Sequence, residues 1–457
     1  MEKIKKAILT EGNIPNQLFR MTIPMVFGLM GMVIFNLADT FFVSKLGSNQ
    51  LAALSFIFPV ILVINSIAIG IGLGAAAVIS KVVGEKNHQK VKRLGTDSIL
   101  LGLCLVVPFL IIGELTIEPL FKLLGAGKNV LPYIKEYMVI WYFGLIAVTI
   151  PMIGNNIIRA MGDTKIPGLI MGVAAIVNII LDPLLIFGIG PFPELGVKGA
   201  AIATVIGRSI TGLVAIYVLC FRERVITFVK VPLKNILESW KKILYIGIPN
   251  SLIKMTLPFA SAIIIKLLST YGAEAVAGYG VASKIQFFAF VFTGALASVM
   301  GPFIGQNVGA KKFERVNTGR KTGEIFSLIA GIILAGIFFI FAKPLALLFS
   351  KNPAVINTIT MYIKIVPITY GAQGVLKIGT TILNVLNKPF HAIGLIIIQL
   401  FVLYLPLALL ASKFYGEIGI YIALAISYLF GGGLAHLEIK KQIVLFRKHI
   451  EQENSEK

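Results

Sequence analysis

Two aspartates in otherwise apolar stretches are the residues of this sequence that could do chemistry. Asp39 lies in GMVIFNLADTFFV, and Asp182 lies in VAAIVNIILDPLLIFG. An asparagine stands about one helical turn before each of them, Asn36 before Asp39 and Asn178 before Asp182, on the same face of the helix. Pro183 removes a backbone donor beside Asp182 and weakens the helix there. An acid, an amide and a disturbed helix together predict a small polar pocket.

Such a pocket could serve two purposes, and the residues alone do not separate them. A carboxyl group buried beside a second carboxyl group could bind and release a proton near physiological pH. The same oxygens, with those of Asn178 and of Thr204 in GAAIATVIG, would equally suit a dehydrated sodium ion. The structural alternative is that Asp39 faces water near the end of its span and that Asp182 caps a turn before Pro183.

Further polar residues lie inside apolar stretches. With Asn36, the amides that could line a substrate cavity or link helices are Asn155, Asn156 and Gln373. Lys254 and Lys377 are more surprising at such positions. Their side chains could reach toward a membrane interface, or they could carry positive charge into the C-terminal half, and both interpretations stay open.

The elements that must position these residues are membrane-spanning helices. Of the 457 residues, 57% are hydrophobic and 14% are charged, and the mean hydropathy is +0.89. These values exclude the soluble protein classes. A helix needs ~20 mainly apolar residues to cross a bilayer. We therefore predict about twelve spans, near residues 17–45, 49–80, 94–113, 130–160, 166–187, 197–220, 242–270, 274–308, 322–342, 354–386, 390–412 and 418–440.

The two halves of the chain repeat each other at a distance of 225 residues. Pro24 matches Pro249, and Gly47 matches Gly272. Glycine and proline decide where a helix bends or ends, so the repeat concerns backbone geometry as well as hydrophobicity. Because each half has an even number of spans, the repeat is expected to be parallel, with its axis along the membrane normal.

We therefore predict an all-α membrane protein with two six-helix lobes related by a parallel pseudo-two-fold repeat. The N-terminal lobe is expected at 1–220, a cytoplasmic amphipathic linker at 221–241, and the C-terminal lobe with a cytoplasmic tail at 242–457. Under the repeat, Asp39 maps onto Ile264, and no acid stands where Asp182 maps. Acidic chemistry is therefore expected in the N-terminal lobe alone.

The net charge of +21 is explained by topology rather than by nucleic acid, which we do not expect as a partner. Basic residues gather after even-numbered spans, within 81–93, 222–242 and 311–321, whereas the short connections after the first and seventh spans contain none. This positive-inside pattern predicts both termini in the cytoplasm and the chain in the plasma (inner) membrane. The polar N-terminal segment shows no cleavable signal pattern, so we expect it in the mature protein.

Enzyme and channel functions are disfavoured by the motifs. The sequence has no phosphate-binding glycine loop that ends in GK[ST], and no nucleophile stands at useful spacing from a base. No filter-like segment recurs between the halves. Neither the histidine spacing nor the two cysteines predict a metal site or a disulfide. We expect no enzyme activity and no cofactor.

Taken together, the motifs resemble those of the MATE (multidrug and toxic compound extrusion) family of cation-coupled efflux transporters. The motifs are IP at 23–24 and 248–249, NLADT at 36–40, LGSNQLAAL at 46–54, VGEKN and VGAKK after the second and eighth spans, RAMGDTKIP at 159–167, and NIILDPLLIFG at 178–188 followed by GVKGAAIAT. The resemblance covers nearly the whole chain.

The resemblance implies two lobes around a central cleft, and export of cationic or amphipathic compounds in exchange for H+ or Na+. Carried over by motif, the coupling-ion site consists of Asp39, Asn178, Asp182 and Thr204. The N-lobe cavity is then lined by Tyr137 and Asn155. In another branch of the family the seventh span carries a glutamate, but this chain reads PNSLIKMTLPFAS there, which puts a C-lobe cation site in doubt. We expect a monomer in the lipid bilayer.

The main alternative is a flippase of lipids or lipid-linked oligosaccharides from the same superfamily. A flippase of anionic carriers should have a cleft rich in Arg and Lys, and Lys254 and Lys377 give this alternative some support. The major facilitator class also has twelve spans in two halves. Its glycine-aspartate loop signature is missing from VGEKNHQKVKR, which disfavours that class.

Overall fold

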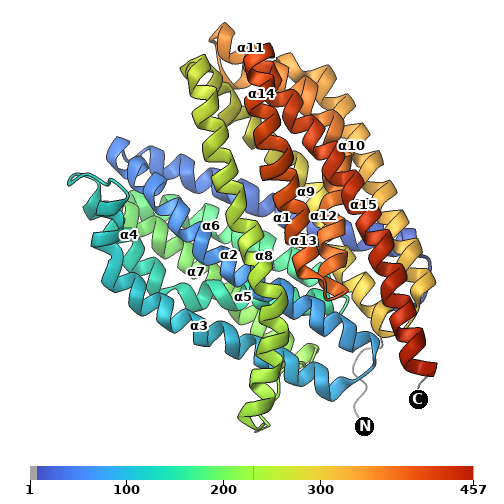
Figure 1. Cartoon of the computed structure of the whole chain (residues 1–457). Coiled ribbons are helices and arrows are strands. Elements are labelled where there is room, and N and C mark those ends of the chain that lie inside the picture. The colour runs from blue at the N-terminus through green and yellow to red at the C-terminus, as the bar shows by residue number, and fades with distance from the viewer. Residues whose placement is uncertain (1–7, 230, 456–457) are drawn as a thin grey trace. The chain divides into compact units, whose positions relative to one another are not determined.

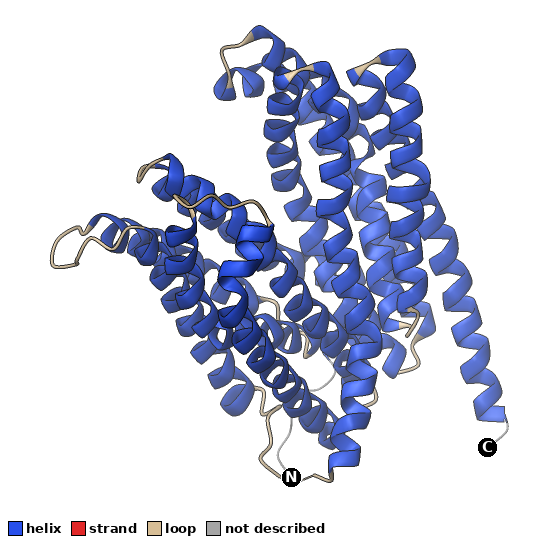
Figure 2. Cartoon of the chain, turned by 60° about the vertical axis from the view of Figure 1, so that its left-hand side comes forward, coloured by secondary structure: helices blue, strands red, loops and turns tan. Residues whose placement is uncertain are grey.

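The structure, a computed structural model, describes residues 8–229 and 231–455, and its regular secondary structure over these residues is helical (Figures 1 and 2). The N-terminal half contains α1 (Ile14–Ser44), α2 (Ser48–Gly84), α3 (His88–Leu123), α4 (Leu131–Phe143), α5 (Leu145–Ala160), α6 (Lys165–Phe187) and α7 (Val197–Tyr217). The C-terminal half contains α8 (Leu233–Leu268), α9 (Ala273–Gly309), α10 (Phe313–Phe349), α11 (Pro353–Ile365), α12 (Tyr370–Val385), α13 (Pro389–Ile397), α14 (Leu405–Tyr415) and α15 (Glu417–Ser455). The predicted cytoplasmic termini fall partly on residues 1–7 and 456–457, which lie outside the described residues.

The all-helical membrane fold is confirmed, but the count of continuous spans is lower than the predicted twelve. Within the described residues, 10 helices are long and apolar enough to cross a membrane, or up to 11 if the bent pair α4 and α5 counts as one span. These two helices meet at an angle of 53°. The predicted span at 354–386 is also broken, into α11, a 3-10 segment at Val366–Thr369 and α12.

Both breaks occur at equivalent places of the repeat. Shifting α5 by 225 residues gives the bounds of α12, because 145–160 becomes 370–385. The short helix before each of them ends at the corresponding break. The duplication therefore includes the interruption of one span in each half, which is a feature of backbone geometry that hydropathy does not show.

The chain divides into two compact units, which we describe separately. Unit 1 contains Ile23–Ser251, and unit 2 contains Leu9–Thr22 and Leu252–Lys457. The predicted linker at 221–241 thus belongs to unit 1, where its last residues form the first turns of α8. Helices α1 and α8 each contribute residues to both units, and the changes occur within two residues of Pro24 and Pro249.

Close backbone contact holds α1 against α6 in unit 1. A Cβ atom added at Gly168 of α6 would lie 2.4 Å from the carbonyl oxygen of Pro24 in α1, so only glycine permits this approach. Helix α6 also packs along α7. Small residues at helix interfaces are typical of membrane bundles. These contacts bring the helices of Asp39, Asp182 and Thr204 together.

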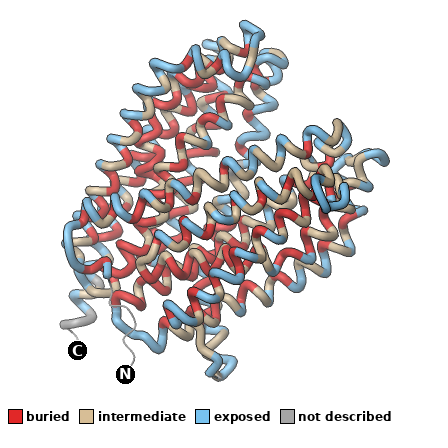
Figure 3. The backbone as a smooth tube through the Cα atoms, turned by 180° about the vertical axis from the view of Figure 1, so that it is seen from behind, coloured by how far each residue is buried: buried red, intermediate tan, exposed pale blue. Residues whose placement is uncertain are grey.

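The burial pattern is that of helices surrounded by lipid. Buried residues run along the packed sides of the helices in Figure 3, while exposed positions include many large apolar side chains, such as Leu115, which is 76% exposed. Large exposed apolar surfaces are unusual for soluble proteins but normal for helices that face lipid tails.

Candidate functional site

The predicted coupling residues lie on three neighbouring helices of unit 1. Helix α6 supplies Asn178 and Asp182, which are four residues apart and therefore on one face. Helix α7 supplies Thr204, and α1 supplies Asp39. Pro183 has no backbone N–H and therefore interrupts the backbone hydrogen bonds of α6. Helix α6 ends one turn later, before Gly188, whose left-handed backbone (φ 68°) suits glycine.

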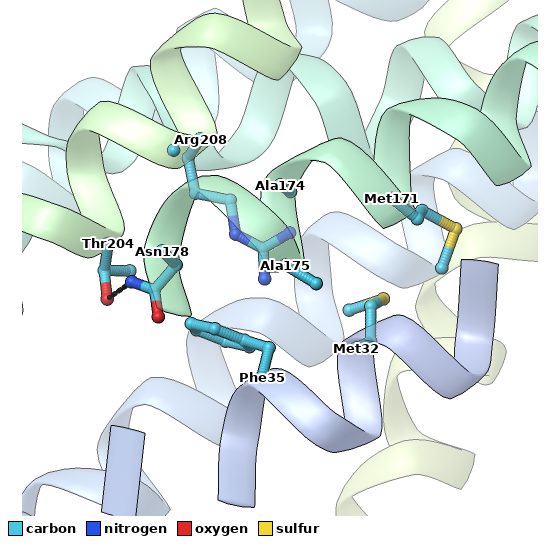
Figure 4. Close-up of a pocket in the computed structure, with 9 residues that line it drawn as sticks. Met32, Phe35, Met171, Ala174, Ala175, Asn178, Thr204 and Arg208 are labelled. Atoms are coloured by element: carbon cyan, nitrogen blue, oxygen red, sulfur yellow. Dashed lines mark hydrogen bonds between the residues drawn. The ribbon is translucent and has the colours of Figure 1, made fainter. Parts of the chain in front are cut away.

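Asp182 is fully buried, and both of its carboxyl oxygens lack a hydrogen-bond partner. The amide of Asn178 lies beside this carboxyl group. Its Nδ2 instead donates to Oγ1 of Thr204 at 3.4 Å, and its Oδ1 has no partner (Figure 4). Buried oxygens without donors are rare in native proteins and call for a specific explanation. A bound cation or proton would provide one.

Asp39 and Tyr137 complete the cluster. The charge of Asp39 acts directly on both Asp182 and Tyr137, so the two predicted acids lie within electrostatic reach of each other. Oδ1 of Asp39 is buried without a partner. Tyr137 of α4 is also buried, and its hydroxyl lies beside that of Thr204. The structure thus brings together five residues that the sequence singled out.

Arg208 is the residue of this region that sequence reasoning missed. It lies one turn after Thr204 on α7, lines a pocket with Asn178 and Thr204, and places its guanidinium 5.8 Å from the ring centroid of Phe35 (Figure 4). Its position inside an apolar span was the available signal, because charged residues in such spans are functional candidates. Arg208 thus places a positive charge in the pocket of Asn178 and Thr204, within electrostatic reach of Tyr137.

The pocket near Asn178 is small and largely apolar. Met32 and Phe35 of α1 close it from one side, and Met171, Ala174 and Ala175 of α6 from another, as Figure 4 shows. It has room for about one water molecule. This space suits an ion or a water molecule rather than a drug-sized compound in the present conformation.

The remaining predicted cavity residues are not part of this cluster of contacts. Asn36 is exposed, and its amide donates to the backbone oxygen of Met32 on its own helix. Asn155 has a buried oxygen without a partner, whereas Asn156 accepts from Arg159 and donates to Met152. Gln373 belongs to α12 of unit 2.

The chemistry available here is reversible binding of a small cation. Oxygens without donors come from Asp39, Asn178 and Asp182, all hard ligands that accept a proton or coordinate sodium. Among the described residues, no three His, Cys, Asp or Glu side chains form a group that could hold a resident metal ion.

Comparisons with known proteins show what the whole chain resembles. The family model MatE matches residues 24–184 and, a second time, residues 249–410. A Shewanella oneidensis protein named FAD transporter is 38% identical over 415 residues, which cover 91% of this chain and 92% of that protein. A Thermotoga maritima protein named probable multidrug resistance protein NorM is 26% identical over 458 residues, which cover 96% of each. A mutant of the Vibrio cholerae MATE transporter VcmN shows a TM-score of 0.90 at 32% identity and covers 94% of this chain and 96% of its own.

Proposed function

Because this chain belongs to the MATE family of multidrug efflux transporters, we propose that it is a secondary antiporter that exports organic compounds in exchange for H+ or Na+. The observation that carries the proposal is the fully buried carboxyl group of Asp182, whose oxygens have no partner, beside Asn178 and within reach of Asp39. An uncompensated acid inside a membrane bundle costs ~2.5–3.5 kcal/mol or more and is therefore a functional-site candidate by default.

The four predicted residues have distinct roles in this proposal. Asp182 and Asp39 carry the charge that the ion neutralises. Asn178 offers its free amide oxygen, and Thr204 holds the Asn178 amide in place through their hydrogen bond. Tyr137 fixes the hydroxyl of Thr204 from α4.

Coupling requires that the ion prefers one conformation over another. Helix α1 is suited to respond, because it carries Asp39, lines the pocket with Met32 and Phe35, and contributes residues to both units. Pro24 weakens its backbone ladder close to the point where α1 passes from one unit to the other. We propose that filling the site reshapes α1 and thereby the substrate cavity.

Two substrate classes have support. The curated relatives named multidrug resistance proteins favour cationic or amphipathic drugs. A relative named FAD transporter is 38% identical, and unit 2 contains the intramembrane residues Lys254 and Lys377, which together favour an anionic flavin dinucleotide as a second candidate. Either substrate would be an amphipathic compound with aromatic rings.

We further propose that the chain acts as a monomer in the plasma (inner) membrane, with both termini in the cytoplasm. The support is the placement of basic residues in the connections after even-numbered spans. The charged connections would also attract anionic lipid headgroups at that surface.

Ion movement on addition of substrate tests antiport. In everted membrane vesicles that contain the chain, an ion gradient is imposed and a drug or FAD is added. The added substrate should dissipate a proton or a sodium gradient at a saturating rate, and empty vesicles should show no such effect. Substrate flux that moves neither ion, or that rises linearly with concentration as in a channel, would contradict the proposal.

A further inference from the structure

Unit 2 contains two lysines inside its apolar helices. Lys254 lies in α8 and Lys377 in α12, both inside long apolar segments. They are near enough for their positive charges to repel each other. Under the repeat they correspond to Leu29 and Met152, so these charges are specific to the second half.

No carboxylate among the described residues pairs with either lysine. The acids of unit 2 whose contacts are known have other partners: Glu324 with Arg320, Glu438 with His391, Glu451 with Arg447, and Glu417 with Tyr421. Intramembrane charges are normally paired or face a substrate or ion pathway. The second possibility applies here.

Lys254 lies on a side of α8 that contains both buried and exposed residues. At 100° per residue, Lys254 lies within about 40° of the buried Leu268. Exposed apolar side chains lie on the opposite face, at Ile263, Phe259 and Leu252, and also beside Lys254, at Ile265. Lys254 is itself exposed.

Lys377 lies over a cluster of three aromatic rings, Phe290, Tyr370 and Tyr428, which we call the Phe290 wall. Its ammonium nitrogen lies 3.8 Å from the ring centroid of Phe290, which packs edge-on against Tyr370 at 4.9 Å and contacts Tyr428 at 6.1 Å. The amide of Gln286 donates to the hydroxyl of Tyr428 at 2.7 Å and fixes that ring. These contacts fix the three rings, which offer stacking partners to a further aromatic ring.

A buried polar atom on the same helix lacks a partner. Gln373 lies one turn before Lys377 on α12, is 8% exposed, and its amide oxygen accepts no hydrogen bond. The hydroxyl of Tyr404, at 3% exposed, has no partner either. Groups of this kind are costly to leave unsatisfied, which indicates that a ligand with N–H or O–H groups completes them.

We infer that Lys254, Lys377, Gln373 and the Phe290 wall form a binding site for an organic anion that carries an aromatic ring. The two ammonium groups would hold a phosphate or diphosphate, Phe290 would stack with the ring, and Gln373 would accept from a ring N–H. This inference rests on the proposed export function, of which it specifies the substrate class. The two halves of the duplicated scaffold then have different binding functions: unit 1 binds the cation, and unit 2 binds the anionic substrate.

Equilibrium binding to the purified full chain in detergent tests the site without any ion gradient. FAD is the probe, and riboflavin, which keeps the flavin ring but lacks phosphate, is its matched ligand. Lys254→Gln and Lys377→Gln should each weaken FAD binding at least about tenfold and change riboflavin binding less than about twofold. Lys377→Arg should retain FAD binding within about threefold. Higher salt should weaken FAD binding more than riboflavin binding.

Lys364→Gln is the control variant, because Lys364 also lies over a ring of unit 2, at 5.5 Å from Phe339, but is exposed. It should leave binding of both ligands unchanged. The inference is overturned if the wild-type chain binds no FAD, if neither glutamine variant weakens it, or if riboflavin loses as much affinity as FAD. Binding that follows the prediction while ion-coupled flux fails would refute the antiport mechanism and leave the anion site standing.

Discussion

At the scale of residues, the central feature is a set of oxygens that nothing in the described protein satisfies. Asp182, Asn178 and Asp39 each present a buried oxygen without a donor, and the hydroxyl groups of Thr204 and Tyr137 hold the cluster in place. A dry bundle retains such groups at a cost, because their desolvation is not repaid by hydrogen bonds. In the proposed mechanism, an exchangeable proton or sodium ion would satisfy all of them together.

Arg208 tests whether the cluster acts as a cation site. Its guanidinium lines the pocket that also contains Asn178 and Thr204, where it should repel an incoming cation, so Arg208→Leu should strengthen cation binding. We expect the ion concentration for half-maximal export to fall by about three- to tenfold. The measurement is the export rate as a function of sodium concentration or of pH. Arg208→Lys keeps the charge and serves as control, and an unchanged or weaker cation affinity in Arg208→Leu would argue against this role.

The site was predictable from the sequence where an unusual residue type sat in an apolar span. Asp39 and Asp182 were identified in this way, and the amide spacing along one helical face added Asn178. The proximity of Tyr137 to Thr204 was not predictable from residue types. The two residues lie on different helices, and only the tertiary packing brings them together. Arg208 was predictable by the same rule as the acids and was missed.

At the scale of elements, the position of Asp39 relative to Asp182 depends on how closely α1 approaches α6. That approach is set by Gly168, where a side chain would meet the backbone of Pro24 at 2.4 Å, and by Gly28, where it would meet Gly168 at 2.8 Å. A larger residue must push the two helices apart, since backbone atoms cannot yield as a flexible side chain can.

Gly168→Val should therefore lower the free energy of unfolding by about 1–3 kcal/mol and weaken ion binding, because it separates the two acids. Thermal unfolding in detergent, with and without the coupling ion, measures both effects. Gly172→Ala is the matched control on the same helix: a Cβ atom there meets nothing within 4 Å, so this variant should be as stable as the wild type or slightly more so. Equal melting temperatures for the Gly168 variant and the wild type would contradict the packing argument.

The sequence predicted roughly where the spans lie, but neither how far the helices extend nor where they bend: the spans expected at 94–113 and 322–342 are the helices His88–Leu123 and Phe313–Phe349. Long apolar segments are visible in composition, and each predicted segment corresponds to helix. The break between α4 and α5 was not predicted, because LIAV after Gly144 is as apolar as any span. Packing between helices explains the glycine at this break: a Cβ atom at Gly144 would lie 2.3 Å from the side chain of Val205 on α7.

At the scale of the whole molecule, duplication kept the scaffold and separated its chemistry. The family model matches the chain twice, and the broken span recurs at equivalent positions in both halves. The acids lie in unit 1 and the unpaired lysines in unit 2. From the 225-residue repeat we expected the acids in the first half alone, because the residues that match Asp39 and Asp182 in the second half are not acidic; the repeat did not predict the lysines.

The proposed topology has a direct labelling test. In a variant without Cys104 and Cys220, a cysteine at Ser48 should react with a membrane-impermeant maleimide in intact cells, because the connection after α1 is expected outside. A cysteine at His88, in the basic connection after α2, should react only after permeabilisation. Both positions are exposed, so access through the membrane decides the result. The reverse labelling pattern would mean that the chain has the opposite orientation.

The central claim, that a cation bound at Asp182 drives export, is tested most directly by transport in proteoliposomes under separately imposed proton and sodium gradients. One of the two gradients should accelerate substrate export by the wild-type chain. Asp182→Asn, inserted in equal amount, should lose that acceleration and run at the rate seen without a gradient, a loss of at least about tenfold, or ~1.4 kcal/mol. If the Asp182→Asn chain still exports substrate at the wild-type, gradient-driven rate, the ion does not act at this site and the account is wrong.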